Sequence, residues 1–283
     1  MLLAIDVGNT ETVIGLYRLG EEDPTVALAE AGVGFGIGAE DQPSRGLTHH
    51  WRLSTVPDRT PDEHAVLLTQ LLDLEGLDIA STVTGMAVSS SVPAVTGELR
   101  QMASRWFKDI PCVVVGPGVK SGLPILYDNP KEVGADRVAN AVGAFDLYGG
   151  PCIVVDLGTA TTFDAISAAG EYLGGAITPG VAISLEALFQ HAAALRRVEL
   201  VEPRDVIGRS TVESIQSGAL YGFAAQVDGL CRRIMAELGP STVVATGGLS
   251  DLIAPYAETI EHIEPWLTLH GLRIVYGRNI AGA

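Results

Sequence analysis

Two short apolar runs, about half a chain apart, are each followed by the same kind of polar turn. Leu2–Ile5 leads into the turn Asp6–Thr10, and Ile153–Val155 leads into the turn Asp156–Thr162. A short apolar run that ends in turn residues predicts a buried strand, and a glycine two residues after each aspartate allows a tight bend. The repeat of this pattern indicates that the chain contains an internal duplication.

The pattern of the first half predicts a β-meander followed by alternating helices and strands. The best-marked helix is Thr60–Leu74, because Pro61 suits the first helical position and acidic side chains follow in the first turn. The expected elements are strands at Leu2–Ile5, Thr12–Tyr17, His50–Ser54, Thr82–Ser89 and Cys112–Val115, and helices at Thr60–Leu74 and Ala94–Trp106. This alternation is typical of an α/β domain.

The second half repeats this order. Its expected strands are Ile153–Val155, Thr162–Ser167, Tyr172–Ile177, Thr242–Ala245 and Ile260–Glu264, and its expected helices are Arg137–Leu147, Val181–Ala194, Val212–Leu238 and Leu249–Ala257. We therefore expect two α/β domains, residues 1–118 and residues 119–283.

A glycine-rich segment, Gly20–Gly46, separates the second and third expected strands. It offers few side chains for packing, so we expect an exposed hairpin excursion or a mobile loop. No helical pattern and no Lys-Ser/Thr pair follow its glycines, which argues against a phosphate-binding loop.

The composition and charge of the chain argue against several classes of function. The chain has 283 residues, of which 47% are hydrophobic, and its formal net charge is −16. Such acidity argues against a nucleic-acid or anionic-membrane surface, and any anionic substrate would need local positive charge. The three cysteines are scattered, which favours free, buried thiols in a reducing compartment. No signal peptide and no apolar run of membrane-spanning length is evident, so we expect a cytoplasmic protein.

The two polar turns are candidates for holding a metal-bound polyphosphate. A carboxylate repels phosphate but can hold Mg²⁺, and Asn9, Thr10, Thr159 and Thr161 can donate hydrogen bonds to phosphate oxygens. The alternative is that each turn simply ends a strand, because Asp, Asn and Gly are ordinary turn residues. Because two copies of the turn occur, each directly after an expected strand, we favour the functional interpretation.

The densest polar constellation is Tyr127–Arg137. Gly134 permits a bend, and Asp136 falls at the start of an expected helix, whose dipole favours a negative charge. If Asp136 faces a cleft, it can accept the proton of a substrate hydroxyl, and Arg137 can hold an anionic group. A capping aspartate beside a surface ion-paired arginine is the alternative.

Three further segments are weaker signals. Gly174–Gly180 and Thr246–Gly248 could bring backbone close to a nucleotide, or could be plain turns, and Ser210 or Thr211 could cap the helix that follows them. The histidines do not show zinc-ligand spacing, and no Gly-x-Ser-x-Gly nucleophile turn occurs.

Taken together in this order, these segments resemble the type III pantothenate kinases, and the two halves resemble the actin/sugar-kinase/Hsp70 superfamily. The resemblance spans nearly the whole chain. It rests on Asp6–Thr10, Trp51-Arg52, Asp128–Pro130, Gly134–Arg137, Asp156–Thr162, Gly174–Ile177, Pro179-Gly180, Gly208, Thr211 and Thr246–Gly248. It implies duplicated ribonuclease H-like (actin-like ATPase) domains with a nucleotide cleft between them.

The resemblance also implies which residues bind the nucleotide and the cations. Asp6, Val7, Gly8, Asn9, Thr10, Glu11, Thr12 and Val13 would form the first phosphate loop, with Asp6 near Mg²⁺ or another divalent cation. Thr159 would contact ATP, and Asp156 would bind K⁺ or NH₄⁺.

For the acceptor, the resemblance implies that Asp136 takes the proton of the pantothenate hydroxyl. The pantothenate site would be lined by Tyr127, Gly134, Ala135, Asp136, Arg137 and Thr211. Thr211 would contribute across a homodimer interface. Enzymes of this family are cytoplasmic and make 4′-phosphopantothenate in the first step of coenzyme A synthesis, with no nucleic-acid or membrane partner.

Two departures from the family pattern and two other hypotheses remain. The Gly20–Gly46 segment is longer than the expected hairpin, and no lysine occurs within Asp6–Tyr17, where the nearest basic residue is Arg18. A nucleotide-responsive protein without catalysis would be expected to lack Asp136. A polyphosphate-acting phosphatase would need a water-activating glutamate, for which the sequence offers no clear candidate.

Overall fold

The computed structural model describes residues 1–19, 46–192 and 194–280, so most of the glycine-rich segment lies outside the described residues. The chain forms two compact units. Unit 1 comprises Met1–Gly122, Asn129–Gly143 and Trp266–Ala283, and unit 2 comprises Leu123–Asp128 and Ala144–Pro265. The domain boundary expected between residues 118 and 119 stays a prediction.

Unit 1 is built on a five-stranded sheet with the order β3-β2-β1-β4-β5. Its strands are β1 (Leu2–Val7), β2 (Glu11–Tyr17), β3 (Leu47–Ser54), β4 (Gly85–Ser90) and β5 (Cys112–Val114). The first three strands are antiparallel neighbours, which confirms the expected meander, and β4 and β5 continue the sheet in parallel with β1. Strand β4 begins later than expected, because the short helix α3 (Ile79–Thr82) occupies the preceding residues.

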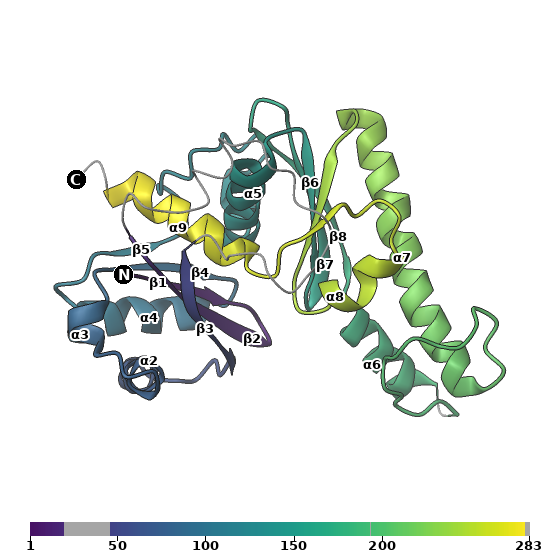
Figure 1. Ribbon diagram of the computed structural model, residues 1–283, viewed down its shortest axis with the longest axis horizontal. Helices are drawn as coiled ribbons and strands as arrows, with labels where there is room; N and C mark the ends of the chain where they lie inside the picture. The colour runs from purple at the N-terminus through teal and green to yellow at the C-terminus, as the bar shows by residue number, and fades with distance from the viewer. Residues whose placement is uncertain (20–45, 193, 281–283) are drawn as a thin grey trace. The chain divides into compact units, whose positions relative to one another are not determined.

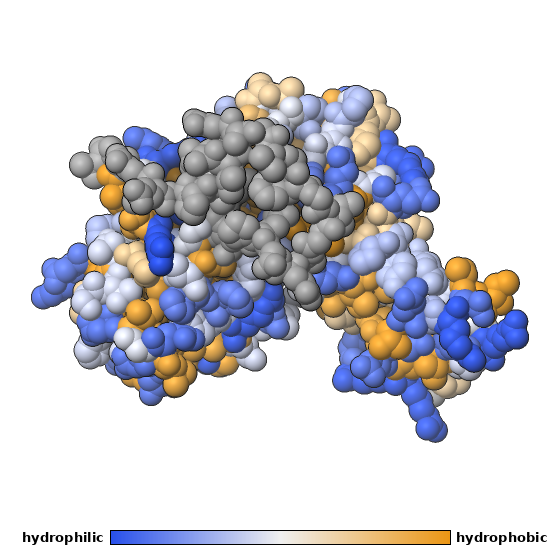
Figure 2. Space-filling model, viewed as in Figure 1, coloured by the Kyte–Doolittle hydropathy of each residue, from blue (hydrophilic) through white to orange (hydrophobic). Residues whose placement is uncertain are grey.

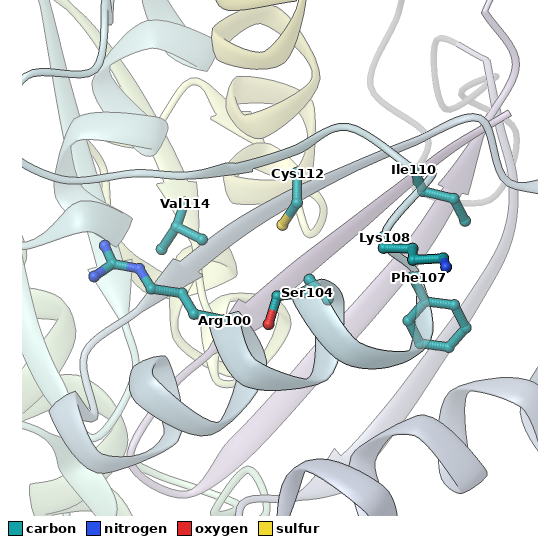
Figure 3. A pocket seen from close by; sticks show the side chains of 8 residues that line it. Arg100, Ser104, Phe107, Lys108, Ile110, Cys112 and Val114 are labelled. Carbon is teal, nitrogen blue, oxygen red and sulfur yellow. The ribbon is translucent and has the colours of Figure 1, made fainter.

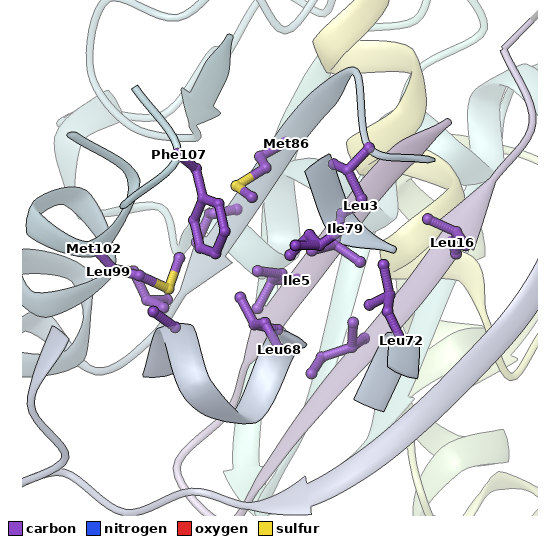
Figure 4. Close-up of a cluster of buried hydrophobic side chains, with 14 of the residues drawn as sticks. Leu3, Ile5, Leu16, Leu68, Leu72, Ile79, Met86, Leu99, Met102 and Phe107 are labelled. Carbon is purple, nitrogen blue, oxygen red and sulfur yellow. The ribbon is translucent and has the colours of Figure 1, made fainter. Parts of the chain in front are cut away.

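Helices α2 (Pro61–Leu74) and α4 (Pro93–Trp106) pack on one face of this sheet, as Figure 1 shows. Thr60 caps α2: its hydroxyl accepts from the Glu63 N–H at 3.3 Å, and the Glu63 carboxylate accepts from the Thr60 N–H at 2.8 Å. Alternate residues of β1 join these helices in the main apolar core of the unit, with Leu3, Ile5, Leu68, Leu72, Leu99 and Met102 shown in Figure 4.

The other face of the sheet is covered by α9 (Leu267–Ile280), the last helix of the described chain (Figure 1). A Cβ at Gly85 of β4 would lie 2.1 Å from the Tyr276 hydroxyl, and a Cβ at Gly15 of β2 would lie 2.8 Å from a Leu269 methyl. This helix was not expected from the sequence. Its buried residues lie around most of its circumference, so its apolar positions do not follow the single stripe that marks an amphipathic helix.

Unit 2 repeats the arrangement of unit 1. Its strands are β6 (Cys152–Leu157), β7 (Ala160–Ile166), β8 (Tyr172–Pro179), β9 (Thr242–Thr246) and β10 (His262–Ile263), in the order β10-β9-β6-β7-β8. Strand for strand, this is the connectivity of the first sheet. The register also shifts at equivalent places, between Leu16 and Tyr17 of β2 and between Ala165 and Ile166 of β7. The expected duplication of an α/β fold is confirmed.

The helices of unit 2 follow the predicted order with altered ends. They are α6 (Val181–His191), α7 (Thr211–Leu238), the short α8 (Ser250–Ile253) and a 3-10 turn, η2 (Ala254–Tyr256). The single helix expected at 249–257 is therefore broken in two, and Pro255, which has no N–H, lies in the second piece. Helix α5 (Ala135–Tyr148) begins in unit 1 and ends in unit 2.

Candidate active site

The first polar turn joins β1 to β2 and is closed by its own backbone. The Gly8 N–H donates to the Glu11 carbonyl at 2.9 Å. Asn9, Thr10 and Glu11 are exposed at the tip, whereas the side chains of Val7 and Thr12 are buried. Of the predicted ATP contacts, Val7 and Thr12 are therefore placed to act only through backbone groups.

Asp6 lies at the end of β1, opposite Ser89 in the parallel register with β4. The fully buried Ser89 hydroxyl donates to Asp6 Oδ1. This hydrogen bond fixes one carboxylate oxygen in a half-buried position. Ser89 was missed by the sequence analysis, because a serine within an apolar strand carries no motif of its own.

Hydrogen bonds from residues that directly follow β3 and β4 hold the rest of the first turn in place. Thr12 Oγ1 and Thr55 Oγ1 are 2.9 Å apart, and Thr55 Oγ1 donates to the Gly8 carbonyl at 2.7 Å. On the other side, Ser91 Oγ donates to the Val7 carbonyl at 3.1 Å. The backbone conformation of this turn is thus held from two neighbouring segments.

A basic side chain does stand beside the first turn, although none occurs within Asp6–Tyr17. Arg52 of β3 forms a 3.1 Å ion pair with Glu11, and its guanidinium carbon lies 5.2 Å from the ring centroid of Trp266. The sequence signal was the Trp51-Arg52 pair, which was recognised only as part of a family motif. Arg52 therefore places a positive charge beside the first turn, where it is paired with the Glu11 carboxylate.

The second polar turn joins β6 to β7 in the equivalent place. The Gly158 N–H donates to the Ala160 carbonyl at 3.1 Å, and Thr159 is exposed at the tip. Asp156 is half-buried and lies opposite Thr246 of β9, as Asp6 lies opposite Ser89. Thr161, by contrast, is only 1% exposed. Its hydroxyl is therefore not placed to reach a phosphate, contrary to the expectation from the sequence.

Glycine is required next to Asp156. A Cβ at Gly247 would lie 2.5 Å from Asp156 Oδ1, and Gly247 has a φ of +91°, which side-chain-bearing residues rarely adopt. Gly247, which follows β9 directly, thus leaves room beside the Asp156 carboxylate.

Helix α6 begins against the second turn. Gly180, its N-cap residue, donates its N–H to the Thr159 carbonyl at 3.1 Å, and a Cβ there would lie 2.3 Å from that oxygen. No side chain caps this helix. The N–H groups of its first turn and the positive end of its dipole favour an anion at this position. The segment Gly174–Gly180 is mostly part of strand β8 rather than a turn. Only its C-terminal end, at Gly180, donates a backbone hydrogen bond to the second polar turn.

Asp136 lies in the first turn of α5 with its carboxylate folded over Gly134. Asp136 Oδ1 accepts from the Arg137 N–H at 2.8 Å, and a Cβ at Gly134 would lie 2.4 Å from the same oxygen. Gly134 is needed for space, and it is not among the described glycines with positive φ. Arg137 is only 9% exposed, so it is not the solvated surface arginine of the alternative interpretation.

The remaining predicted substrate residues lie in unit 2. Tyr127 is half-buried beside β8, and Thr211 is the exposed first residue of α7. Ser210 caps that helix by accepting from the Glu213 N–H at 3.2 Å, which leaves the Thr211 side chain outside the capping interaction.

The carboxylates of the two turns suit cations that the phosphate groups of a substrate also help to bind. Within the described residues, no three His, Cys, Asp or Glu side chains gather as a metal site. Mg²⁺ in phosphoryl-transfer sites is usually held by one or two carboxylates together with phosphate oxygens and water, so a half-buried carboxylate such as Asp6 is of the type that this role needs. At Asp156, the missing side chain of Gly247 keeps one side of the carboxylate open.

A cavity of about 420 Å³ lies elsewhere in unit 1, between the end of α4 and β5 (Figure 3). It is lined by Arg100, Ala103, Ser104, Phe107, Lys108, Ile110, Cys112 and Val114. None of these is a predicted site residue.

All three cysteines are free thiols, as the sequence indicated. Cys152 and Cys231 are buried as expected, whereas Cys112 is partly exposed. Burial raises the pKa of Cys112 to about 11 and that of Cys152 to about 12, so neither is an activated nucleophile. Across residues 1–19, 46–192 and 194–280, no helix has the length and apolar character needed to cross a membrane.

Known proteins resemble the chain over its full length. The family model described as type III pantothenate kinase matches residues 2–233. The type III pantothenate kinase of Streptomyces griseus is 50% identical over 290 residues, covering 100% of each chain, and that of Streptomyces avermitilis is 51% identical over 288 residues, covering 99% of each. The activator of 2-hydroxyisocaproyl-CoA dehydratase from Clostridium difficile, solved with ADPNP, has a TM-score of 0.53 at 12% identity, covering 99% of this chain and 94% of that chain. At this identity the match shows a shared fold alone.

Proposed function

Because the chain belongs to the type III pantothenate kinase family, we propose that it transfers the terminal phosphoryl group of ATP to pantothenate. The product is 4′-phosphopantothenate, and the reaction is the first step of coenzyme A synthesis. The observation that carries this proposal is the full-length similarity to kinases of this name, together with Asp136 at the start of α5 and an Asp-x-Gly turn in each half.

The two turns bind the phosphates of ATP. Exposed Asn9 and Thr10 in the first turn and Thr159 in the second present hydrogen-bond donors, and the uncapped start of α6 adds backbone N–H groups. Arg52 contributes positive charge near the first turn. These groups offset the repulsion that an acidic chain exerts on a polyanion.

Cations complete the charge balance. Asp6 holds Mg²⁺ or another divalent cation, and its hydrogen bond from Ser89 fixes the carboxylate for that purpose. Asp156 holds K⁺ or NH₄⁺. When bound, these ions neutralise charge on the phosphates during transfer.

Asp136 is the proton acceptor for the attacking hydroxyl. Its Oδ1 is held by the Arg137 N–H, so the carboxylate is oriented before substrate arrives, and its second oxygen can accept the hydroxyl proton. Arg137, Gly134 and Ala135 shape the neighbouring pantothenate site.

Pantothenate is also bound by Tyr127 and by Thr211, with Thr211 acting in a homodimer. Large exposed apolar side chains support an interface near the start of α7: Val201 (45% exposed), Val206 (66%), Ile207 (82%) and Val212 (48%). Figure 2 shows apolar surface in the part of unit 2 that contains α6 and the start of α7. Exposed apolar side chains that gather in one segment favour an interaction site there.

We place the enzyme in the cytoplasm. The reaction consumes ATP, and the free thiols of Cys112, Cys152 and Cys231 suit a reducing compartment.

The test is ADP formation by the purified full-length chain with ATP, Mg²⁺ and K⁺, with and without pantothenate. We expect ADP to appear only when pantothenate is present, and to appear much more slowly when Na⁺ replaces K⁺. ADP formation that is independent of pantothenate would overturn the proposal in favour of a phosphatase. Nucleotide binding without any turnover would favour a non-catalytic nucleotide-responsive protein.

A further inference from the structure

The segment that carries Tyr127 is attached to β8 by an isolated β-bridge. The Tyr172 N–H donates to the Pro124 carbonyl at 2.9 Å, and the Leu126 N–H donates to the Tyr172 carbonyl at 2.8 Å. Ile125 forms a parallel bridge with Tyr172. The backbone of Tyr172 therefore holds the three residues that precede Tyr127.

The side chain of Tyr172 is fixed in the interior of unit 2. It is 1% exposed, and its hydroxyl donates to Asp164 Oδ1 at 2.7 Å. Asp164 itself is fully buried on β7 and also accepts from Thr162 Oγ1 at 3.3 Å. A hydrogen bond to a buried carboxylate is stronger than a neutral one, so it sets the orientation of the Tyr172 ring.

The ring of Tyr127 rests on this fixed support. The Tyr127 and Tyr172 ring centroids are 6.3 Å apart with an angle of 58° between the planes, a tilted arrangement that aromatic pairs favour. Beside it, a Cβ at Gly174 would lie 3.2 Å and 3.3 Å from Tyr127 Cε2 and Cδ2. Gly174 also has a φ of +118°. A glycine at this position lets the Tyr127 ring lie against the backbone of β8.

We infer that Tyr172, held by Asp164, and Gly174 are positioning residues that set the place of Tyr127 and thereby the affinity of the enzyme for the pantothenate acceptor. This inference rests on the proposed contact of Tyr127 with pantothenate. It adds residues that lie on β7 and β8, none of which the family resemblance placed in the acceptor site.

The first test changes the hydroxyl of Tyr172. Tyr172→Phe keeps the ring and removes its bond to Asp164, and we expect the KM for pantothenate to rise about 3–10-fold while the KM for ATP stays unchanged. Tyr148→Phe is the matched control, because the Tyr148 hydroxyl also donates to a carboxylate of unit 2, that of Glu264. The control should change neither KM.

The second test adds a methyl group at Gly174, where the Tyr127 ring lies against the backbone of β8. Gly174→Ala should raise the KM for pantothenate about 10-fold, because the new methyl group displaces the ring. Gly239→Ala is its control: Gly239 also has positive φ, at +93°, but no atom lies within 4 Å of the position of its Cβ. Both variants lose some stability, which thermal melts will report, and only Gly174→Ala should alter pantothenate affinity.

A double-mutant cycle between Tyr127→Ala and Tyr172→Phe completes the design. If Tyr172 acts through Tyr127, the double variant should have the pantothenate KM of Tyr127→Ala alone. If Tyr127→Ala leaves that KM unchanged in a pantothenate-dependent enzyme, the proposed contact of Tyr127 fails and the inference with it. If Tyr127→Ala raises it while Tyr172→Phe and Gly174→Ala match their controls, or if the effects in the cycle simply add, the inference alone is overturned.

Discussion

The duplication places two threonines in equivalent positions with opposite hydrogen-bonding states. Thr12 is paired with Val7 across β1 and β2, and Thr161 is paired with Leu157 across β6 and β7. Thr12 Oγ1 lies 2.9 Å from Thr55 Oγ1, whereas Thr161 Oγ1, in a residue only 1% exposed, makes no hydrogen bond to any described residue.

Valine has nearly the shape of threonine without the hydroxyl, so Thr161→Val should stabilise the protein. An unsatisfied buried hydroxyl costs about 1–3 kcal/mol, and the substitution removes that cost. Thr12→Val removes a hydrogen bond instead and should destabilise by about 0.5–1.5 kcal/mol. The two changes are chemically identical, and the structure predicts opposite signs for them.

Urea unfolding followed by circular dichroism measures both effects. With a slope of about 1–3 kcal/mol per molar urea, a change of about 2 kcal/mol moves the midpoint by about 1 M. Thr161→Val should raise the midpoint with an unchanged slope, and it should leave the KM for ATP unchanged because the side chain is buried. A lowered midpoint for Thr161→Val would refute the reasoning, since it would show that the hydroxyl has a stabilising partner.

Three further predictions concern catalysis, nucleotide binding and pH. Asp136→Asn keeps an oxygen that accepts from the Arg137 N–H but cannot take a proton, so kcat should fall about 10²–10⁴-fold while the circular dichroism spectrum is unchanged; a near-normal rate would remove Asp136 as the base. Arg52→Ala should raise the KM for ATP several-fold, whereas Arg18→Ala, at another exposed arginine of unit 1, should not; equal effects would contradict a local role for Arg52. Burial lowers the pKa of His64 from 6.5 to about 4. The stability that neutral His64 contributes is therefore complete above about pH 6.5 and is lost as the pH falls toward 4. His64→Gln should flatten the pH dependence of the urea midpoint between about pH 6.5 and 4. If the pH dependence of the midpoint is unchanged, His64 is excluded as the source of that dependence.

Local patterns predicted most of the elements, because their signals lie within a few residues. Pro61 and the acidic side chains of Asp62 and Glu63 placed the start of α2 to within one residue, and the two Asp-x-Gly turns placed the ends of β1 and β6 to within two residues. These features depend on nearest neighbours along the chain. The duplicated sheet order could then be inferred from the repeat of those turns.

The parts that sequence did not predict depend on neighbours distant in the chain. Ser89 reaches Asp6 across two parallel strands, and Tyr172 reaches Tyr127 through a bridge between segments with no shared pattern. Arg52 was expected only as a motif residue, because its pairing with Glu11 depends on the register of β2 and β3. In each case the residue type is ordinary, and its role comes from the strand that brings it to the site.

The path of the chain has a consequence for synthesis. Strands β1, β2 and β4 are made well before α9, the helix that covers one of their faces and follows all the other described elements. About 180 residues separate the end of β4 from the start of α9. At roughly 5–20 residues per second, the ribosome needs on the order of 10–35 s to make them. Throughout that interval an apolar face of the nascent sheet stays uncovered, so a chain that terminates early would leave a chaperone substrate instead of a stable N-terminal fragment.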